Sequence, residues 1–477
     1  MSATDSTTET QEFDLIVLGA GPIGETLALA VAQQGLKPVI VEHDLVGGDC
    51  AYYACKPSKA LLRPVEVAAT TQHLRGVGGS RVGADDLLKR RDEQVSNYDD
   101  SGQEESLESS GVTVVRGHGQ LNGERTVEVH GSDGAAQTLR ATRSVVVTTG
   151  TTPNIPPVFE GIPVWDSQDA TSVQDVPAHL VIIGAGAVAC EAASWMNSLG
   201  SKVTMLVREG SLMSSAEPFV SDILTDQFSD AGIDVRFYTE ATQVQRPDGM
   251  DQGLGKVKGG PVSIRTSEGE TLQADEVLLA TGRRPALESI NLESIGLSAD
   301  DVLEQRTPDW LHALGDAGGK HQLTHMGKYQ AKQFAAGFLG QQVDEPSIEP
   351  PTPQVVFTDP QVASVGLTEE AATEAGYEVV TGEVDFADVV GAGLLRDDVV
   401  GKGKIVVDKT TGYLLGATLM GPETGEMLHA ATIAITGQVP VSTLQHAIPV
   451  FPTASEIWVG LLDQVTGWSR TGYEPVT

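Results

Sequence analysis

The sequence of 477 residues is poor in cysteine, in aromatic side chains and in positive charge. Three cysteines cannot form the disulfide framework of a secreted protein, so the sequence predicts a cytoplasmic chain whose structural thiols stay reduced. The 31 Lys and Arg residues face 65 Asp and Glu residues, and the formal net charge of −34 repels nucleic acid and anionic lipid. No stretch reaches the ~20 apolar residues of a transmembrane helix, so no membrane partner is predicted.

The length is sufficient for three domains of ordinary size, and the hydrophobic content of 40% fits a soluble globular chain. The excess acid is spread along the sequence and predicts a solvated, salt-tolerant surface. Residues 1–12 lack the basic and apolar regions of a secretory signal and are predicted to form a disordered tail. The sequence predicts no metal site.

Two segments repeat the order strand, glycine turn, helix and strand that a βαβ unit requires. The first covers residues 13–42 and the second covers residues 180–207. In both, the helix-ending glycine follows the first glycine by 16 residues, at 19 to 35 and at 184 to 200. The repetition predicts two separate dinucleotide-binding domains. After residue 348, short strand-like stretches separated by Thr and Gly predict a third, α+β domain with an antiparallel sheet.

The first unit carries the complete dinucleotide fingerprint at Gly19, Gly21 and Gly24. These glycines permit the tight turn, the approach of a pyrophosphate and the close packing of helix on strand. Glu42 ends the second strand, where a carboxylate is predicted to bind a ribose hydroxyl.

The second unit differs at both ends of this pattern. It reads Gly184, Gly186 and Ala189, and Val207 takes the place of the ribose-binding acid. The next residue, Arg208, can bind the 2′-phosphate that a carboxylate would repel, so this unit is predicted to prefer NADPH to NADH. The alternative is a solvated surface arginine.

Cys50 and Cys55 lie in the segment 47–59, just after the first unit. On a regular helix, residues five apart point about 140° away from each other, so a bridge between them requires an irregular turn, which the two preceding glycines permit. Lys56 and Lys59 favour thiolate chemistry. We therefore predict a redox-active pair; the alternative is two unrelated small buried residues.

Together these segments resemble the pyridine nucleotide-disulfide oxidoreductase family, which includes dihydrolipoamide dehydrogenase, glutathione reductase and mercuric reductase. The resemblance runs from Phe13 to about Trp468. It implies an α/β homodimer with two Rossmann-like dinucleotide-binding domains, one for FAD and one for NAD(P), plus a C-terminal α+β dimerisation domain. The implied order is an FAD-binding domain at 13–157, an NAD(P)-binding domain at 158–282, a return segment of the FAD-binding domain at 283–347, an interface domain at 348–468 and a tail at 469–477.

The resemblance also implies roles for single residues. Cys55 would lie against the flavin and Cys50 would meet the substrate, while Lys59 would lie beside the flavin nitrogen that accepts hydride, with Glu191 as its ion-pair partner. Asp316, in the segment 311–318, would bind the ribityl chain. Further cofactor contacts are implied for Gly48, Thr149, Gly150, Gly282 and Arg283.

One departure from the family lies near the C-terminus. The disulfide reductases carry a His-Pro-Thr segment whose His is the catalytic base, paired with a Glu five residues later. This chain keeps that acid as Glu456 but has Phe451 in place of the His. His446 is predicted to be an ordinary core or surface histidine. Residues 469–477 hold no Cys, which argues against mercuric reductase and the large thioredoxin reductases.

A second departure surrounds the cysteine pair. Asp49 replaces the usual Thr before the first cysteine, and Tyr52 and Tyr53 make the connection between the cysteines bulkier than in the family.

We therefore predict an FAD-dependent NAD(P)H oxidoreductase whose electrons leave through Cys50 and Cys55 to an acceptor that the sequence does not name. One alternative is a quinone or diaphorase-type reductase in which electrons leave directly from the flavin. Another is a cofactor-loaded redox sensor or complex subunit with little turnover. Because the ring of Phe451 cannot act as a base, we expect poor turnover of lipoamide or glutathione disulfide.

Overall fold

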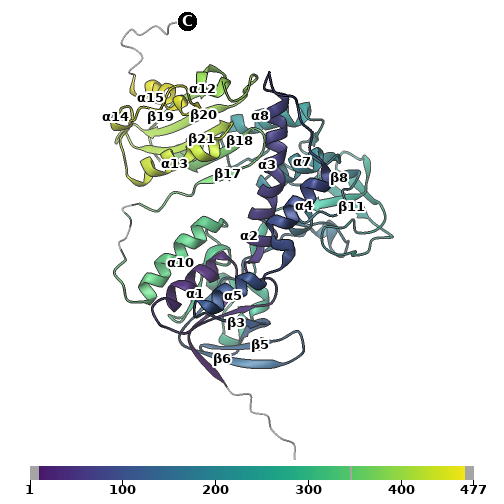
Figure 1. The fold of residues 1–477 in the computed structure, drawn as a ribbon, viewed down its shortest axis with the longest axis vertical. Coiled ribbons are helices and arrows are strands. Elements are labelled where there is room, and N and C mark those ends of the chain that lie inside the picture. The colour runs from purple at the N-terminus through teal and green to yellow at the C-terminus, as the bar shows by residue number, and fades with distance from the viewer. Residues whose placement is uncertain (1–9, 344–345, 347, 468–477) are drawn as a thin grey trace, which may run out of the picture. The chain divides into compact units, whose positions relative to one another are not determined.

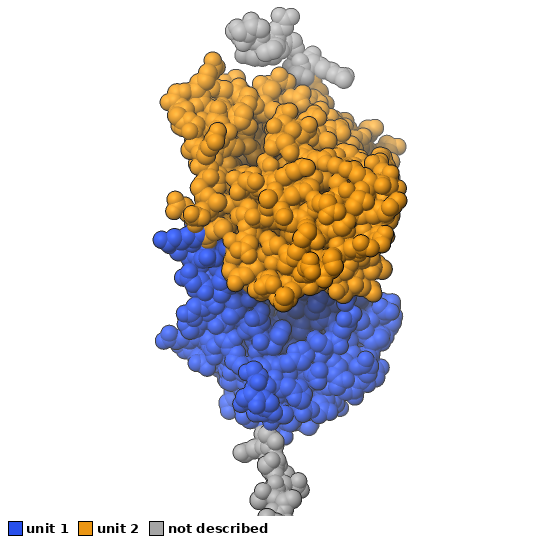
Figure 2. Space-filling model, turned by 90° about the vertical axis from the view of Figure 1, so that its right-hand side faces the viewer, with its two compact units in different colours: residues 1–58, 89–154, 282–345 blue, residues 59–88, 155–281, 346–477 orange. Residues whose placement is uncertain are grey.

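The computed structural model describes residues 10–343, 346 and 348–467, and the chain divides into two compact units. Unit 1 comprises residues 1–58, 89–154 and 282–345, and unit 2 comprises residues 59–88, 155–281 and 346–477 (Figure 2). Residues 59–88 thus belong to unit 2, although the family resemblance implies that they are part of the first domain. Within the described ranges, no helix is long and apolar enough to cross a membrane.

Unit 1 is built around a sheet with the strand order β3-β2-β1-β6-β5-β4, and β16 pairs with β6 outside this path. β1 is parallel to both of its neighbours, β2 and β6, and its last four residues are buried, as in a sheet covered on both faces. The strands are β1 (Gln11–Leu18), β2 (Pro38–Glu42), β3 (Thr113–Arg116), β4 (His118–Leu121), β5 (Thr126–His130), β6 (Ala136–Val147) and β16 (Leu311–Ala313). The helices are α1 (Pro22–Ala32), α2 (Gly48–Tyr52), α5 (Ser101–Ser109), α9 (Ala299–Leu303) and α10 (Thr324–Phe338) (Figure 1).

The start of β1 corrects one predicted boundary. β1 begins at Gln11, so Gln11 and Glu12 form part of the strand rather than of a tail. Residues 1–9 and the tail predicted at 469–477 lie outside the described residues. α1 begins at Pro22 directly after the glycine turn, a position at which proline loses no helical hydrogen bond. A separate two-stranded sheet pairs β7 (Thr151–Pro153) with β15 (Arg283–Pro285).

The first part of unit 2 contains a parallel sheet in the order β10-β9-β8-β14 and a small antiparallel sheet, β11-β12-β13. Its core includes the fully buried Trp165 and Trp195. The strands are β8 (His179–Ile183), β9 (Lys202–Leu206), β10 (Asp234–Arg236), β11 (Ala241–Gln245), β12 (Val262–Thr266), β13 (Thr271–Ala274) and β14 (Glu276–Leu279). The helices are α6 (Ser167–Thr171), α7 (Ala187–Ser198) and α8 (Pro218–Asp230), while α3 (Cys55–Gln72) and α4 (Ala84–Gln94) include the residues at which the units divide.

The last part of unit 2 is an antiparallel sheet in the order β17-β18-β21-β20-β19, in agreement with the predicted α+β region. α13 and α15 pack on this sheet around Phe386 and Leu419. The strands are β17 (Gln354–Val356), β18 (Gln361–Gly366), β19 (Val379–Asp385), β20 (Lys402–Asp408) and β21 (Leu414–Gly421). The helices are α11 (Glu369–Glu374), α12 (Val390–Gly393), α13 (Thr424–Thr436), α14 (Val441–Leu444) and α15 (Ile457–Thr466).

Candidate functional site

The glycine turn of unit 1 has the geometry that a dinucleotide requires. Gly19 has a φ of +105°, and a Cβ atom there would lie 2.5 Å from the carbonyl oxygen of Thr148. A Cβ atom on Gly24 would lie 2.2 Å from the Gly19 oxygen, whereas one on Gly21 would meet no atom within 4 Å. The backbone is therefore packed behind the turn and open in front of it, where a diphosphate can approach the N-terminus of α1.

Glu42 is fixed beside this turn at the end of β2, with only 6% of its surface exposed. Its two carboxylate oxygens accept the backbone N–H groups of Ala20 (2.6 Å) and Asp44 (2.8 Å). Burial raises the pKa of Glu42, but hydrogen bonds from His43 and from the two backbone groups outweigh burial and lower the pKa overall. The side chain is held as an ionised acceptor, as binding of a ribose hydroxyl requires.

Other predicted cofactor residues of unit 1 lie around the same turn. A Cβ atom on Gly48 would lie 2.8 Å from the Cα atom of Gly21. The Thr149 hydroxyl donates to the carbonyl of Ala286 (2.7 Å), and the carbonyl of Gly150 accepts the Ala286 N–H (2.9 Å). The open face of the turn and the ionised Glu42 fit the adenosine diphosphate half of FAD.

Arg283, in β15, interacts with the carboxylates of Asp49 and Asp316 in unit 1. Its guanidinium donates to Asp49 (2.9 Å) and to the carbonyl of Thr151 (2.6 Å), and Gly282 before it has a φ of +95°. Burial raises the pKa of Asp316, while the charge of Arg283 opposes this rise and the charge of Asp49 adds to it. The acid that replaces the family's Thr is therefore neutralised by an arginine.

Cys50 lies on α2 and Cys55 begins α3, so an irregular turn separates them. Gly47 and Gly48 have φ values of +121° and +58°, conformations that glycine adopts without strain. Neither cysteine is in a disulfide, and a hydrogen bond with Cys55, followed by burial, strongly raises the pKa of Cys50. Two neighbouring thiols joined by a hydrogen bond can form a disulfide by losing two electrons and two protons.

Two contacts of the segment that contains the cysteines were not predicted from the sequence. Thr324, the first residue of α10, places its hydroxyl oxygen 3.4 Å from the Cys55 sulfur. The ring of Tyr53 stacks on that of Tyr98, with centroids 5.9 Å apart and an interplanar angle of 27°. Both partners come from distant segments, and no local spacing identifies them.

In unit 2, Lys59 and Glu191 form an ion pair. The Lys59 ammonium lies 3.0 and 2.9 Å from the two carboxylate oxygens of Glu191, which is buried on α7. The backbone N–H of Phe357 donates to the same carboxylate (2.9 Å), and the ammonium lies 4.8 Å from the centre of the Phe357 ring. Lys59 follows Cys55 by about one turn along α3. Its position beside the flavin stays a prediction.

The glycine turn of unit 2 has the same open front. Gly184 has a φ of +135°, and a Cβ atom there would lie 2.3 Å from the carbonyl oxygen of Ala280. A Cβ atom on Gly186 would meet nothing within 4 Å. Ala189, which stands where the first unit has glycine, is fully buried, so its methyl group is accommodated between α7 and the sheet.

Arg208 lies on the surface after β9. Its side chain is 75% exposed and lies 3.6 Å from the Glu209 carboxylate and 4.0 Å from the Glu240 carboxylate. Val207 before it is buried. The guanidinium is accessible to a phosphate, with two acidic neighbours as its surface partners.

The segment before α15 contains Phe451, which is 69% exposed. In the described structure, the Oε2 atom of Glu456 is buried without a hydrogen-bond partner. His446 is exposed, and its assignment as an ordinary histidine stays a prediction. An orphaned buried carboxylate oxygen is rare.

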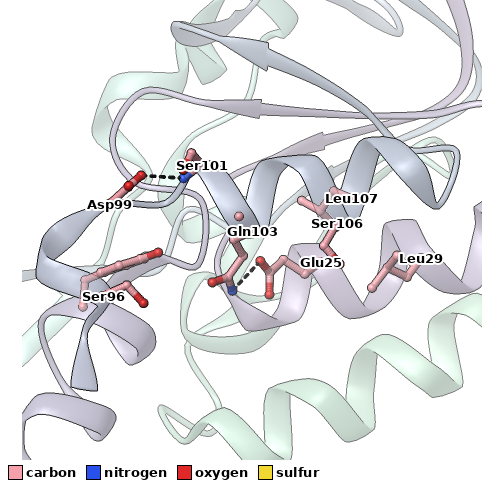
Figure 3. Close-up of a pocket in the computed structure, with 10 residues that line it drawn as sticks. Glu25, Leu29, Ser96, Asp99, Ser101, Gln103, Ser106 and Leu107 are labelled. Atoms are coloured by element: carbon pink, nitrogen blue, oxygen red, sulfur yellow. Dashed lines mark hydrogen bonds between the residues drawn. The ribbon is translucent and has the colours of Figure 1, made fainter. Parts of the chain in front are cut away.

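A cavity of about 540 Å³ lies against α1 and α5 of unit 1 (Figure 3). Across it, Gln103 donates to the carboxylate of Glu25 (3.0 Å), and burial raises the pKa of Glu25 against this bond and the charge of Lys328. Its wall contains Tyr52 but none of the predicted site residues. Over the described parts of the chain, no cluster of three or more His, Cys, Asp or Glu could hold a metal ion.

Two family models match the chain. The pyridine nucleotide-disulphide oxidoreductase model covers residues 13–331, and the dimerisation domain model of the same family covers residues 352–461. These matches confirm the predicted resemblance, fold class and enzyme class, and the second supports a homodimer.

Curated relatives match over nearly the whole chain. A dihydrolipoyl dehydrogenase of Thermus scotoductus is 33% identical, covering 93% of this chain and 95% of the relative, and one of Haloferax volcanii is 30% identical, covering 93% and 94%. A mercuric reductase of Acidithiobacillus ferrooxidans is 30% identical, covering 94% of this chain and 81% of the relative.

Solved structures share the fold. The HOCl-induced flavoprotein disulfide reductase RclA from Escherichia coli matches with a TM-score of 0.81 at 24% identity, covering 95% of this chain and 100% of that chain. LpdA from Mycobacterium tuberculosis matches with a TM-score of 0.82 at 20% identity, covering 96% and 100%.

Proposed function

Because this chain belongs to the pyridine nucleotide-disulphide oxidoreductase family, we propose that it oxidises NADPH and passes two electrons, through FAD and the Cys50–Cys55 pair, to a planar apolar acceptor such as a quinone. In the balanced reaction, NADPH, one proton and a quinone give NADP⁺ and a hydroquinone. When bound, FAD supplies the two-electron carrier that links the nucleotide to the thiols.

The residues of the chain support this reaction at separate points. The turn of unit 1 and Glu42 hold the adenosine end of FAD, and the Lys59–Glu191 ion pair keeps an oriented ammonium on α3. Cys50 and Cys55 take up two electrons and two protons when their disulfide opens and release both when it closes. The raised pKa of Cys50 keeps the thiol that would meet the acceptor protonated.

The observation that carries the choice of acceptor is Phe451 together with the orphaned oxygen of Glu456. Exchange with a dithiol substrate needs a group that takes a proton from one sulfur and returns it to another. Positioned acid–base groups contribute roughly 10²- to 10⁴-fold in rate, and a phenyl ring can do neither task. An exposed ring instead offers a flat apolar surface, which suits a quinone better than a peptide-like disulfide.

The test compares wild type with Phe451→His on lipoamide, glutathione disulfide and a quinone. We expect the variant to gain about 10²-fold or more in disulfide turnover and to change little with the quinone. The matched control is Ile448→His, which adds an imidazole at a more exposed position of the same segment and should gain nothing. Wild-type turnover of lipoamide at hundreds per second, a rate of about the order found in good enzymes, would contradict the proposal.

The same assays, with a Cys50→Ser variant added, separate the two alternatives. If electrons leave directly from FAD, quinone turnover survives the loss of Cys50. If the protein is a sensor or complex subunit, NADPH oxidation stays slow with every quinone and disulfide tested.

A further inference from the structure

Tyr238 combines an exposed ring with a left-handed backbone. Its side chain is 75% exposed and its φ is +53°, a conformation that is a genuine outlier for a bulky residue. Such strain persists where the surrounding structure imposes it, and it is common at ligand sites. The strain therefore calls for an explanation in terms of what holds Tyr238 and what its ring faces.

The backbone around Tyr238 is bonded to the segment that follows β9. The N–H of Tyr238 donates to the carbonyl of Glu209 (3.2 Å), and the N–H of Thr239 donates to the carbonyl of Val207 (3.0 Å). A Cβ atom on Gly210 would lie 2.1 Å from the Tyr238 hydroxyl oxygen. The phenol therefore lies over the backbone of Gly210, and the missing side chain at that position makes room for it.

This position is at the nucleotide edge of the parallel sheet. β9 and β10 are parallel neighbours, so their carboxyl ends meet at one edge, and Arg208 and Tyr238 each follow the end of one of these strands. Dinucleotides bind across this edge in folds of this kind, with the adenosine ribose at the end of the second strand of the βαβ unit. The backbone bonds of residues 238 and 239 to residues 209 and 207 hold the Tyr238 ring next to the segment that contains Arg208, so the ring is a candidate for contact with the adenine.

We propose that Tyr238 stacks on the adenine of the pyridine nucleotide while Arg208 binds its 2′-phosphate. This inference rests on the proposed oxidation of NADPH and adds the residue that recognises the base. Stacking would cover a ring that is otherwise left in water. The contacts of Arg208 with Glu209 and Glu240 are surface ion pairs of small net strength, so a phosphate with a charge-assisted hydrogen bond can displace them.

The experiment measures binding of 2′,5′-ADP and 5′-AMP to the FAD-loaded protein by calorimetry, without turnover. Tyr238→Ala should weaken binding of both probes by the same factor of about ten or more, and Tyr238→Phe, which keeps the ring, should restore both affinities. Arg208→Gln should weaken 2′,5′-ADP alone. The matched control, Tyr377→Ala, removes an exposed tyrosine from the connection between α11 and β19 and should change neither affinity.

A second variant separates ring loss from misfolding. Tyr238→Gly removes the ring at a φ that glycine adopts freely, so the unfolding midpoint should not fall while both affinities drop. The proposal is overturned if Tyr238→Ala and Tyr238→Gly bind both probes as wild type does, or if Tyr238→Phe is as weak as Tyr238→Ala. If wild type binds the two probes equally but needs Tyr238 for both, the stacking stands and the NADPH preference fails. Wild type that binds neither probe contradicts both.

Discussion

The two glycine turns of this protein have similar backbones but carry side chains of opposite charge at, or just after, the end of their second strand. Gly19 and Gly184 share a left-handed φ, and Gly21 and Gly186 share an open front. In unit 1 the second strand ends in Glu42, which is buried and bonded to two backbone N–H groups. In unit 2 the buried Val207 takes that place, and the exposed Arg208 follows it.

Because of this difference, one motif can serve two kinds of ligand. A buried carboxylate whose oxygens are already fixed is preorganised, as suits a cofactor that stays bound. An exposed arginine with two weak carboxylate partners can exchange them for the phosphate of a nucleotide that must leave after each turnover. The contrast predicts unequal consequences when matched residues of the two turns are changed.

The largest expected effect comes from the cysteines that follow each turn. A hydrogen bond with Cys55 is the main cause that raises the pKa of Cys50, whereas burial raises the pKa of Cys190, behind the second turn, to about 12. Cys50→Ser should lower quinone turnover by about 10³-fold or more, and Cys190→Ala should leave it unchanged. Alkylation should count two more reactive thiols in NADPH-reduced wild type than in oxidised protein, and no such gain in Cys50→Ser.

Either of two results would contradict the prediction that electrons leave through a Cys50–Cys55 disulfide. Quinone turnover that persists in Cys50→Ser means that electrons leave directly from FAD. A wild-type protein whose count of reactive thiols does not rise with NADPH has no disulfide at this position.

Local patterns in the sequence were sufficient for the main features of the fold. The glycine spacing and apolar strands predicted both βαβ units because a tight turn, a helix and a parallel strand follow each other within about 30 residues. The need for an irregular turn between Cys50 and Cys55 followed from helical geometry alone, and α2 ends between them. The short strands after residue 348 predicted an antiparallel sheet, which the structure contains.

The parts that could not be predicted depend on long-range packing. Thr324 contacts Cys55 only because α10 begins next to this cysteine in the fold, although the two residues are 269 positions apart in the sequence. The pairing of Asp49 with Arg283 requires β15 to lie beside β7. Asp49 was visible as a departure from the family, but its partner was not, since a sequence pattern reveals neighbours along an element and not across a fold.

A smaller effect is expected when the sign of the charge on the second turn is changed. Arg208→Glu places an acid one residue after the position at which unit 1 has one, so the ratio of kcat/KM for NADPH to that for NADH should fall by about 10- to 100-fold. The reason is that a carboxylate repels a 2′-phosphate and accepts a ribose hydroxyl. Steady-state assays with both nucleotides measure the ratio, and Arg265→Glu, an exposed arginine on β12, is the matched control. An unchanged ratio would assign Arg208 to the solvated surface.

The smallest expected effect concerns the pH dependence of stability at Glu42. The folded pKa of Glu42 is lowered, so its contribution is present above the unfolded pKa of about 4.3 and is lost as pH falls through the folded value. The pKa of His43 is raised, mainly by its hydrogen bond to Glu42. The contribution of His43 to stability is therefore complete below its unfolded pKa of about 6.5 and is lost as pH rises through the folded value. Glu42→Gln leaves one buried N–H without an acceptor and should cost about 1–3 kcal/mol.

The loss caused by Glu42→Gln should therefore be greatest between these two limits and smaller on both sides, as measured by thermal unfolding midpoints at a series of pH values. Glu25→Gln on α1 is the matched control of opposite sign, because burial raises the pKa of Glu25 and penalises its charged form. Relative to wild type, Glu25→Gln should gain stability as pH rises above about 4.3. If both variants lose the same stability at every pH, the charge of Glu42 does not contribute to stability and only the packing of its side chain does. The preorganised charge that distinguishes the first turn from the second would then be absent.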